Sequence, residues 1–250
     1  MTNERVLRVA LLIDADNSPA DRIDLILNEL STVGETSIRR AYGNWKKAEL
    51  KPWEDRLHAY AIRPMQQYDY SKGKNASDMA MVIDAMAMLY TDRPDAFGIV
   101  SSDADFTPLV MHLRERGTAV FGFGQKKTPE PFVNACSRFL YLDQLAEGAT
   151  DDAPQPSLRL TTAQLRSDTK LVTLLRNTVQ AVADDSGWAR VGVVGHQIAN
   201  QASFDPRNYG YATLSKLLMA TQLFEVINEG TSQVAVRDKL AAKKAASKPA

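Results

Sequence analysis

The sequence predicts an α/β fold in its first half and a small α+β domain of the winged helix-turn-helix kind in its second half. Up to about residue 145, short apolar runs alternate with helical patterns, as in parallel βαβ units. The stretch "EGATDDAPQP", residues 147–156, has glycine, two prolines, acids and no bulky apolar residue, which indicates an exposed linker. After it, three helical patterns precede two short strand-like runs, which is typical of a winged helix.

Composition sets the limits of the interpretation. The 250 residues are 44% hydrophobic, enough for one large core or two smaller ones. The single cysteine, Cys136, excludes an internal disulfide framework and a cysteine zinc site. The apolar run near the N-terminus stops at Asp14, too early for a signal peptide or a membrane span, so we expect a cytoplasmic protein without a membrane partner.

The expected domain boundaries follow from these patterns. The first domain covers residues 1–147, the linker 148–158 and the winged helix 159–238. Residues 239–250 are rich in alanine and lysine and end in proline, which predicts a disordered tail.

Apolar runs predict the strands of the first domain. They are typical of buried parallel strands, which are apolar on both faces. They cover residues 6–13, 36–42, 60–66, 96–100 and 118–123, with a closing helix and strand within 132–142.

Helical patterns fill the intervals between the runs. Ser18 is expected to cap a first helix whose apolar residues recur at helical spacing, and "WEDRLHAY" predicts a short second helix. Ser77 is expected to cap a third helix, and a fourth covers 106–116. The residues expected to form the buried stripe of the third helix are Met79, Val82, Ile83, Met86 and Leu89. The predicted product is a largely parallel sheet with helices on both faces.

Acidic residues gather where two predicted strands end. Asp14 and Asp16 follow the first strand, Asp103 and Asp105 follow the strand at 96–100, and Asp78 begins the helix between them. In open α/β sheets, ligands bind outside the carboxyl ends of the strands. Carboxylate oxygens suit Mg²⁺ or Mn²⁺, which can polarise a phosphodiester and activate a water.

Each acid also has a structural interpretation. For Asp78 the alternative is a favourable interaction with the helix dipole and no other role. For Asp105 the alternative is to cap the helix that follows it. Asp84 lies six residues after Asp78, about 240° around the helix, so the two do not share a face and we expect Asp84 to be structural.

Three segments together resemble a known family. "LLIDADN", "KGKNASDMAMVIDAM" and "IVSSDADFTPLV" are similar, in order and spacing, to the NYN domain, a branch of the PIN-like nucleases. The resemblance covers about residues 5–145. It implies a PIN-like αβα sandwich whose acidic pocket binds Mg²⁺ or Mn²⁺ and cleaves RNA.

The resemblance also implies roles for individual residues. Asp14, Asp78 and Asp103 would be the catalytic, metal-holding acids, with Asp105 a fourth in or beside the pocket. Asn17 would orient the first loop or touch a phosphate. Asp16 occupies a position where the family also takes glutamate.

Several polar residues near the acids are candidates for binding substrate. The loop "YDYSKGKNAS" offers Lys72, Lys74 and Asn75 to phosphates, with Tyr68 or Tyr70 available to stack on bases. The alternative is a solvated loop without a partner.

Two further groups of polar residues lie near the same strand ends. Ser101 is expected to support Asp103 and is a further substrate-binding candidate. A second basic patch, for which ordinary surface solubility is the alternative, comprises Arg39, Arg40, Trp45, Lys46 and Lys47.

The second half resembles another family. "FDPRNYGYATLSKLLMATQLFEV" is similar to the OST-HTH or LOTUS domain, which implies a winged helix that binds RNA or recruits a protein partner. Arg207, Asn208 and Lys216 are the candidates for RNA contact, and Tyr209 and Tyr211 are candidates for the core as much as for RNA. A domain that only packs or dimerises is the structural alternative.

The sequence therefore predicts a metal-dependent endoribonuclease with an accessory RNA-binding domain. One rival is an RNA-binding adaptor whose pocket binds a metal without useful turnover. Another is a haloacid-dehalogenase-like phosphatase, suggested by Asp14-Ala15-Asp16, although the following "NSPAD" lacks the usual glycine-threonine turn. DNA is an alternative substrate, because carboxylates that bind a metal do not distinguish a nucleotide with a 2′-hydroxyl from one without it.

Overall fold

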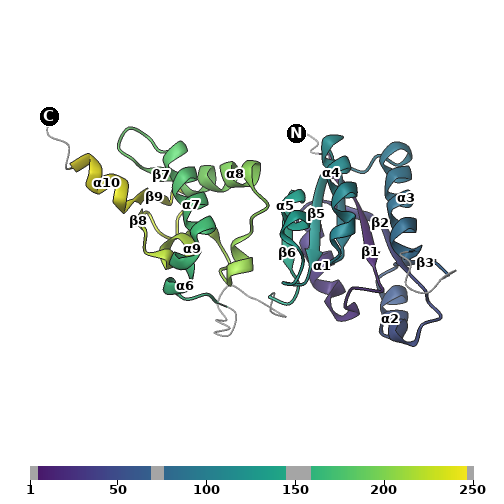
Figure 1. Ribbon diagram of the computed structural model, residues 1–250. Helices are drawn as coiled ribbons and strands as arrows, with labels where there is room; N and C mark the ends of the chain where they lie inside the picture. The colour runs from purple at the N-terminus through teal and green to yellow at the C-terminus, as the bar shows by residue number, and fades with distance from the viewer. Residues whose placement is uncertain (1–4, 69–75, 145–158, 247–250) are drawn as a thin grey trace. The chain divides into compact units, whose positions relative to one another are not determined.

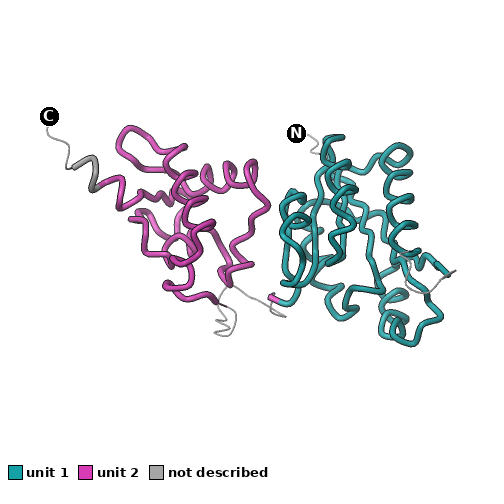
Figure 2. Tube along the Cα trace, in the orientation of Figure 1, with its two compact units in different colours: residues 1–143 teal, residues 144–250 magenta. Residues whose placement is uncertain are grey.

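The computed structural model describes residues 5–68, 76–144 and 159–246. The chain divides into two compact units, Met1–Asp143 and Gln144–Ala250 (Figure 2). None of the helices in the described ranges combines the length and the apolar composition needed to cross a bilayer.

The first unit contains a parallel sheet, which confirms the predicted α/β fold (Figure 1). The order across the described sheet is β3-β2-β1-β4-β5-β6, and each neighbouring pair is parallel. The strands are β1 (Arg8–Asp14), β2 (Glu35–Gly43), β3 (Arg63–Gln66), β4 (Ala96–Val100), β5 (Ala119–Gly124) and β6 (Arg138–Tyr141).

Helices connect these strands and cover both faces of the sheet. Alternate residues of a strand point to opposite faces. On one face, Leu12 and Ile99 belong to the same buried cluster as residues of the third and fourth helices. On the other face, a Cβ at Gly98 would approach Leu11 and Leu30, and Leu30 belongs to the first helix. The helices are α1 (Ile23–Ser31), α2 (Lys51–Ala59), α3 (Ala76–Thr91), α4 (Thr107–Glu115) and α5 (Glu130–Ala135), with 3₁₀ turns η1 (Ala20–Arg22), η2 (Ala48–Leu50) and η3 (Ala104–Phe106).

The buried face of α3 differs from the predicted stripe. Met79 and Ile83 are 58% and 64% exposed, and the buried residues of the helix are Ser77, Met81, Ala85, Met88 and Leu89. The helix is apolar on most of its circumference, so more than one stripe fits its sequence. Contact with β1 and β2 selects the face that is buried.

Two predicted helix caps are also wrong. The Ser18 hydroxyl donates to the Val100 carbonyl at 3.3 Å, and η1 separates Ser18 from α1. Ser77 lies inside α3, and its hydroxyl donates to Asp16 at 2.9 Å. Both serines connect segments that are distant in sequence, a role that local cap patterns do not reveal.

The second unit is a small α+β domain, as predicted. Its described antiparallel sheet has the order β7-β9-β8, so one short strand joins the expected two-stranded wing. Thr161 and Gln164 form a capping box that starts the first helix. The elements are α6 (Thr162–Ser167), α7 (Thr169–Ala181), β7 (Ala189–Arg190), α8 (Val191–Gln201), η4 (Pro206–Tyr209), α9 (Leu214–Thr221), β8 (Phe224–Ile227), β9 (Ala235–Asp238) and α10 (Lys239–Ala246).

The start of the expected tail is helical. Residues 239–246 form α10, where the sequence indicated disorder from 239 onward. Alanine and lysine are strong helix formers, which explains the difference. Residues 247–250, and the whole predicted linker, 148–158, lie outside the described residues.

Candidate nuclease site

The candidate site lies where the order of the strands reverses. β1 and β4 are neighbours in the sheet although two strands separate them in sequence, and Ile13 pairs with Val100 at their carboxyl ends. The chain leaves β1 toward one face of the sheet and leaves β4 toward the other, and open α/β sheets bind their ligands at such a switch point. Asp14 ends β1, and Ser101 follows β4 directly.

Asp14 is the most buried acid of the site, with 1% of its surface exposed. Its carboxylate accepts hydrogen bonds from Asn17 Nδ2 at 3.1 and 3.3 Å and from Ser101 Oγ at 2.9 Å. Burial raises the pKa of Asp14 from 3.8 to about 6, against the lowering effect of these hydrogen bonds, and the charges of Asp78 and Asp16 raise it further. This carboxylate is therefore held in place at a cost in electrostatic energy.

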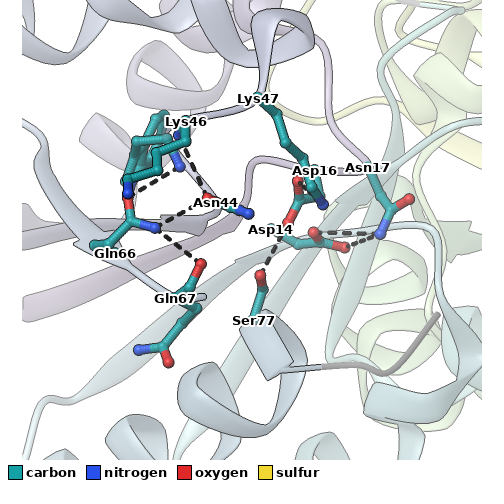
Figure 3. Close-up of polar contacts among 10 residues, drawn as sticks. Asp14, Asp16, Asn17, Asn44, Lys46, Lys47, Gln66, Gln67 and Ser77 are labelled. Carbon is teal, nitrogen blue, oxygen red and sulfur yellow. Dashed lines mark hydrogen bonds and ion pairs between the residues drawn. The ribbon is translucent and has the colours of Figure 1, made fainter. Parts of the chain in front are cut away.

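Asp16 connects three separate segments. Its Oδ1 pairs with Lys47 Nζ at 3.2 Å, and its Oδ2 accepts a hydrogen bond from Ser77 Oγ at 2.9 Å (Figure 3). Lys47 follows β2, and Ser77 lies in the first turn of α3. Asp16 therefore fixes the start of α3, which carries Asp78, against the end of β1.

Asp78, Asp103 and Asp105 complete the group of acids. Burial raises the pKa of Asp78, and the charges of Asp103, Asp16 and Asp105 raise it further, so these carboxylates interact electrostatically. The backbone N–H of Asp103 donates to Ser101 Oγ at 3.1 Å, and Asp103 Oδ1 accepts from the N–H of Asp105 at 2.9 Å. Together with Asp14 and Asp16, these three acids form what we call the acid cluster.

Hydrogen bonds to neighbouring residues set the present positions of three carboxylates of the acid cluster. In the part of the chain that the structure describes, no group of three or more His, Cys, Asp or Glu side chains is placed to hold a metal ion. Asp14, Asp16 and Asp103 instead accept hydrogen bonds from the residues around them.

A second group of polar residues, absent from our sequence predictions apart from Trp45, Lys46 and Tyr68, lies beside the acid cluster at the ends of β2 and β3 (Figure 3). Gln66 accepts a hydrogen bond from the N–H of Trp45 at 3.1 Å and donates to Asn44 Oδ1 at 3.0 Å. Lys46 Nζ lies 5.0 Å from the centre of the Tyr68 ring. Asn44 directly follows β2, and Gln66 is the last residue of β3. A polar residue at the carboxyl end of a strand is the sequence signal that could have indicated both.

The other predicted substrate-binding residues of the first unit have different outcomes. Lys72, Lys74 and Asn75 lie outside the described residues, as does Tyr70. Arg39 donates to the Tyr60 carbonyl at 2.8 Å, and Arg40 pairs with Asp84 at 2.6 Å. The two arginines are therefore engaged in contacts within the first unit, and Asp84 has a structural partner.

The candidates in the second unit also have local partners. Arg207 binds both carboxylate oxygens of Asp205, at 2.9 and 2.8 Å, and Asp205 is 4% exposed. Tyr211 is buried and donates to the Leu160 carbonyl at 2.6 Å. Lys216 is half-buried on α9, and Asn208 lies in η4.

Two family models match the chain. The NYN domain matches residues 8–143, and the OST-HTH/LOTUS domain matches residues 166–236. The chain is 29% identical over 121 residues to the uncharacterized protein MJ0482 of Methanocaldococcus jannaschii, and this match spans 47% of each protein.

Among solved structures, part of the chain is similar to VPA0982, a protein of unknown function from Vibrio parahaemolyticus. The match covers 56% of this chain and 96% of VPA0982, at 18% identity and a TM-score of 0.45. The NYN match spans more than half of the chain, so the chain belongs to the NYN domain family and carries an OST-HTH/LOTUS domain after its NYN domain.

Proposed function

We propose that this chain is a divalent-metal-dependent endoribonuclease that hydrolyses RNA phosphodiester bonds. The observation that carries the proposal is the buried Asp14 carboxylate, which interacts with the charges of Asp16 and Asp78 at the point where the strand order reverses. Residues far apart in the sequence supply these charges, which supports a shared chemical role. Membership of a PIN-like nuclease family supports the same activity.

The chemistry of the donors fits Mg²⁺ or Mn²⁺. All the donors of the acid cluster are oxygens, which hard divalent cations prefer. Burial and like charges raise the pKa of Asp14 and of Asp78, and a divalent cation would offset both effects. The proposed ligands are Asp14, Asp78 and Asp103, with Asp105 a fourth, and a bound ion would polarise the phosphodiester and lower the pKa of an attacking water.

The remaining residues of the site orient the acids. Asn17 and Ser101 donate to Asp14 and fix its carboxylate, and Asn17 is also a candidate for phosphate contact. Ser101 additionally accepts from the Asp103 N–H, so one hydroxyl sets the relative position of the acids from β1 and β4. Asp16 holds Lys47, whose ammonium can approach a phosphate at the edge of the cluster.

We assign the second domain an accessory role, either binding RNA or recruiting a protein partner. The OST-HTH match supports this role. The proposed RNA contacts are Lys216, Asn208 and Arg207, of which Arg207 must also maintain its pair with Asp205.

The decisive experiment compares RNA cleavage by the wild type with that by Asp14→Asn and Asp103→Asn in Mg²⁺ and in Mn²⁺. We expect both variants to fold, as judged by circular dichroism, and to lose turnover at least about a hundredfold, because each removes one anionic ligand. Asp55→Asn, an equivalent change at an exposed position of α2, is the matched control and should cleave at the wild-type rate. Wild-type cleavage by either site variant would contradict the mechanism.

One observation favours a second candidate function, an RNA-binding adaptor. The Asp14 and Asp103 carboxylates accept hydrogen bonds from neighbouring residues, and the described residues contain no group of three or more acidic, histidine or cysteine side chains already spaced to hold a metal. Tight RNA binding without products over hours, in both metals, would select the adaptor. A DNA strand of the same sequence, assayed in parallel, tests whether the 2′-hydroxyl matters, and rapid hydrolysis of a small phosphomonoester with no action on RNA would instead indicate a phosphatase.

A further inference from the structure

The loops at the carboxyl edge of the sheet follow one another in the order of the strands. The ends of β1 and β4, which carry most of the acid cluster, occupy the middle, and the ends of β2 and β5 lie on either side. Neighbouring strands are about 4.8 Å apart, so the edge from β3 to β5 spans about 19 Å. Both flanks of the acid cluster carry lysines, Lys46 and Lys47 after β2 and Lys126 and Lys127 after β5.

The first flank joins a cation to an aromatic ring. Lys46 Nζ lies 5.0 Å from the centre of the Tyr68 ring, and Tyr68 is 47% exposed. Gln66 bonds both Asn44 and the N–H of Trp45, which fixes the loop that carries Lys46 (Figure 3). The next residue, Lys47, pairs with Asp16, so this flank is continuous with the acid cluster.

The second flank is held against the opposite side of the cluster. The N–H of Gln125 donates to Ser102 Oγ at 2.9 Å, and the N–H of Lys126 donates to the Asp143 carboxylate at 3.0 Å. A Cβ at Gly124 would lie 2.6 Å from the Ser101 carbonyl oxygen, which shows how closely β5 approaches the loop after β4. The ammonium groups of Lys126 and Lys127 are exposed and form no ion pair within the described part of the chain.

Cations on both sides of an acidic centre offset its repulsion of a polyanion. The two flanks provide them, at opposite ends of one row of loops. Tyr68 adds an exposed ring, and base stacking on an aromatic ring requires a base that is not stacked inside a duplex. These three features together favour an extended single strand over a helix.

We propose that a single-stranded nucleic acid binds across the carboxyl edge of the sheet, with phosphates on Lys46, Lys126 and Lys127 and one base stacked on Tyr68. This proposal rests on the proposed function, because it places the phosphate to be cleaved at the acid cluster between the flanks. It assigns phosphate-binding roles to Lys126 and Lys127, and it places them on one path with Tyr68, the stacking candidate from the sequence.

The test measures binding of the full-length protein to a fluorescent, unstructured RNA of about 12 nucleotides, in EDTA, over a series of salt concentrations. Each phosphate contact of a single strand contributes about 0.7 to the slope of log K against log salt, so the double variant Lys126→Gln, Lys127→Gln should reduce the slope by about 1.4. Tyr68→Ala should weaken binding at least about fivefold and should not affect a duplex of the same sequence. The matched control is Arg93→Gln, Arg116→Gln, which removes two exposed cations before the amino ends of β4 and β5, at the opposite edge of the sheet, and should leave the slope unchanged.

A second measurement is independent of RNA binding by the second unit. Bound RNA should protect Lys126 and Lys127 from acetylation, as read by mass spectrometry. An unchanged slope together with unprotected lysines overturns the proposal, as does binding of a duplex more tightly than the single strand. Because EDTA removes divalent metal, these results do not depend on cleavage. An absence of RNA cleavage would therefore contradict the proposed function without contradicting the proposed binding of a single strand along this edge.

Discussion

Ser101 and Asp14 join the ends of the two central strands through a buried hydrogen bond of 2.9 Å between Ser101 Oγ and Asp14 Oδ2. The same hydroxyl accepts from the Asp103 N–H, and Ser101 has no exposed surface. The acids after β1 and β4 are therefore held in a fixed relation by one side chain. This relation leads to the first prediction.

Ser101→Ala should impair both the stability and the pH response of the site. Loss of the hydroxyl leaves buried polar groups unpaired, which costs about 1 to 3 kcal/mol in the free energy of unfolding. It also removes a hydrogen bond that lowers the pKa of Asp14, so the acid limb of the pH–rate profile should move to higher pH. Denaturant titration and cleavage rates between about pH 5 and 8 measure the two effects. Ser102→Ala, which removes an acceptor for the Gln125 N–H and not for the acids, should leave the acid limb in place.

Asp14→Asn should change the pH dependence of stability of the metal-free protein. Because the pKa of Asp14 rises from 3.8 to about 6 on folding, the folded state binds the proton more tightly than the unfolded state between these values. The stability of the wild type should therefore fall as pH rises through this window, by about 3 kcal/mol. The variant lacks this loss, so its stability relative to the wild type should increase by that amount between about pH 4 and pH 7.5.

Urea denaturation in EDTA at these pH values measures the difference. Asp55→Asn, at an exposed position of α2, serves as the control and should give a flat difference curve. A flat curve for Asp14→Asn as well would show that the carboxylate is not destabilised by burial.

Gly124→Ala should disturb the site through packing alone. The added Cβ would meet the Ser101 carbonyl oxygen at 2.6 Å and Thr128 Oγ1 at 2.8 Å, so the backbone has to move, at about 1 to 3 kcal/mol. Because Ser101 orients Asp14, cleavage should fall as well. In Gly192→Ala on α8 the new Cβ meets no atom within 4 Å, so that control should keep full activity and gain up to about 0.5 kcal/mol in helix stability. Equal stability of the two variants would refute the close approach of β5 to the loop after β4.

Arg207→Ala should destabilise the second unit, because it leaves the Asp205 carboxylate, 4% exposed, without its bidentate partner. Removing one member of a buried ion pair costs about 3 to 5 kcal/mol, an upper limit here because Arg207 is partly exposed. Lys216→Ala should leave the unfolding transition within about 0.5 kcal/mol of the wild type. Thermal unfolding of the two variants shows whether Arg207 has a structural role. RNA binding is measured beside it, and a loss of binding in Lys216→Ala without a loss of stability would indicate that the surface of α9 contacts RNA.

The parts of the fold that the sequence predicts well have one strong local signal. Residues 96–100 form β4 as expected, because a short apolar run that follows a proline and ends in polar residues favours a buried strand over a helix. The buried face of α3 was not predictable in the same way, because Met79 and Ile83 are as apolar as Met81 and Met88. Only the position of the sheet decides which of these residues is covered.

The same distinction applies to the acid cluster. The topology of a parallel sheet predicts that Asp14 and Asp103 lie near each other. Their partners are not predictable from local pattern, because Asp16 binds Lys47 31 positions away and Asp84 binds Arg40 44 positions away. Lys126 and Lys127 have no motif, and their place beside the acids becomes visible only from the strand order.

The strand order also separates two tasks within one edge of the sheet. The central pair, β1 and β4, carries acids that depend on one another through Ser101, so a change at one disturbs the others. The outer loops, after β2 and β5, contact the centre through Lys47, which pairs with Asp16, and through Gln125, which donates to Ser102. Under the proposed function, substitutions in these loops would alter which nucleotides are preferred before they alter the reaction, so descendants of this chain would acquire new targets without rebuilding their chemistry.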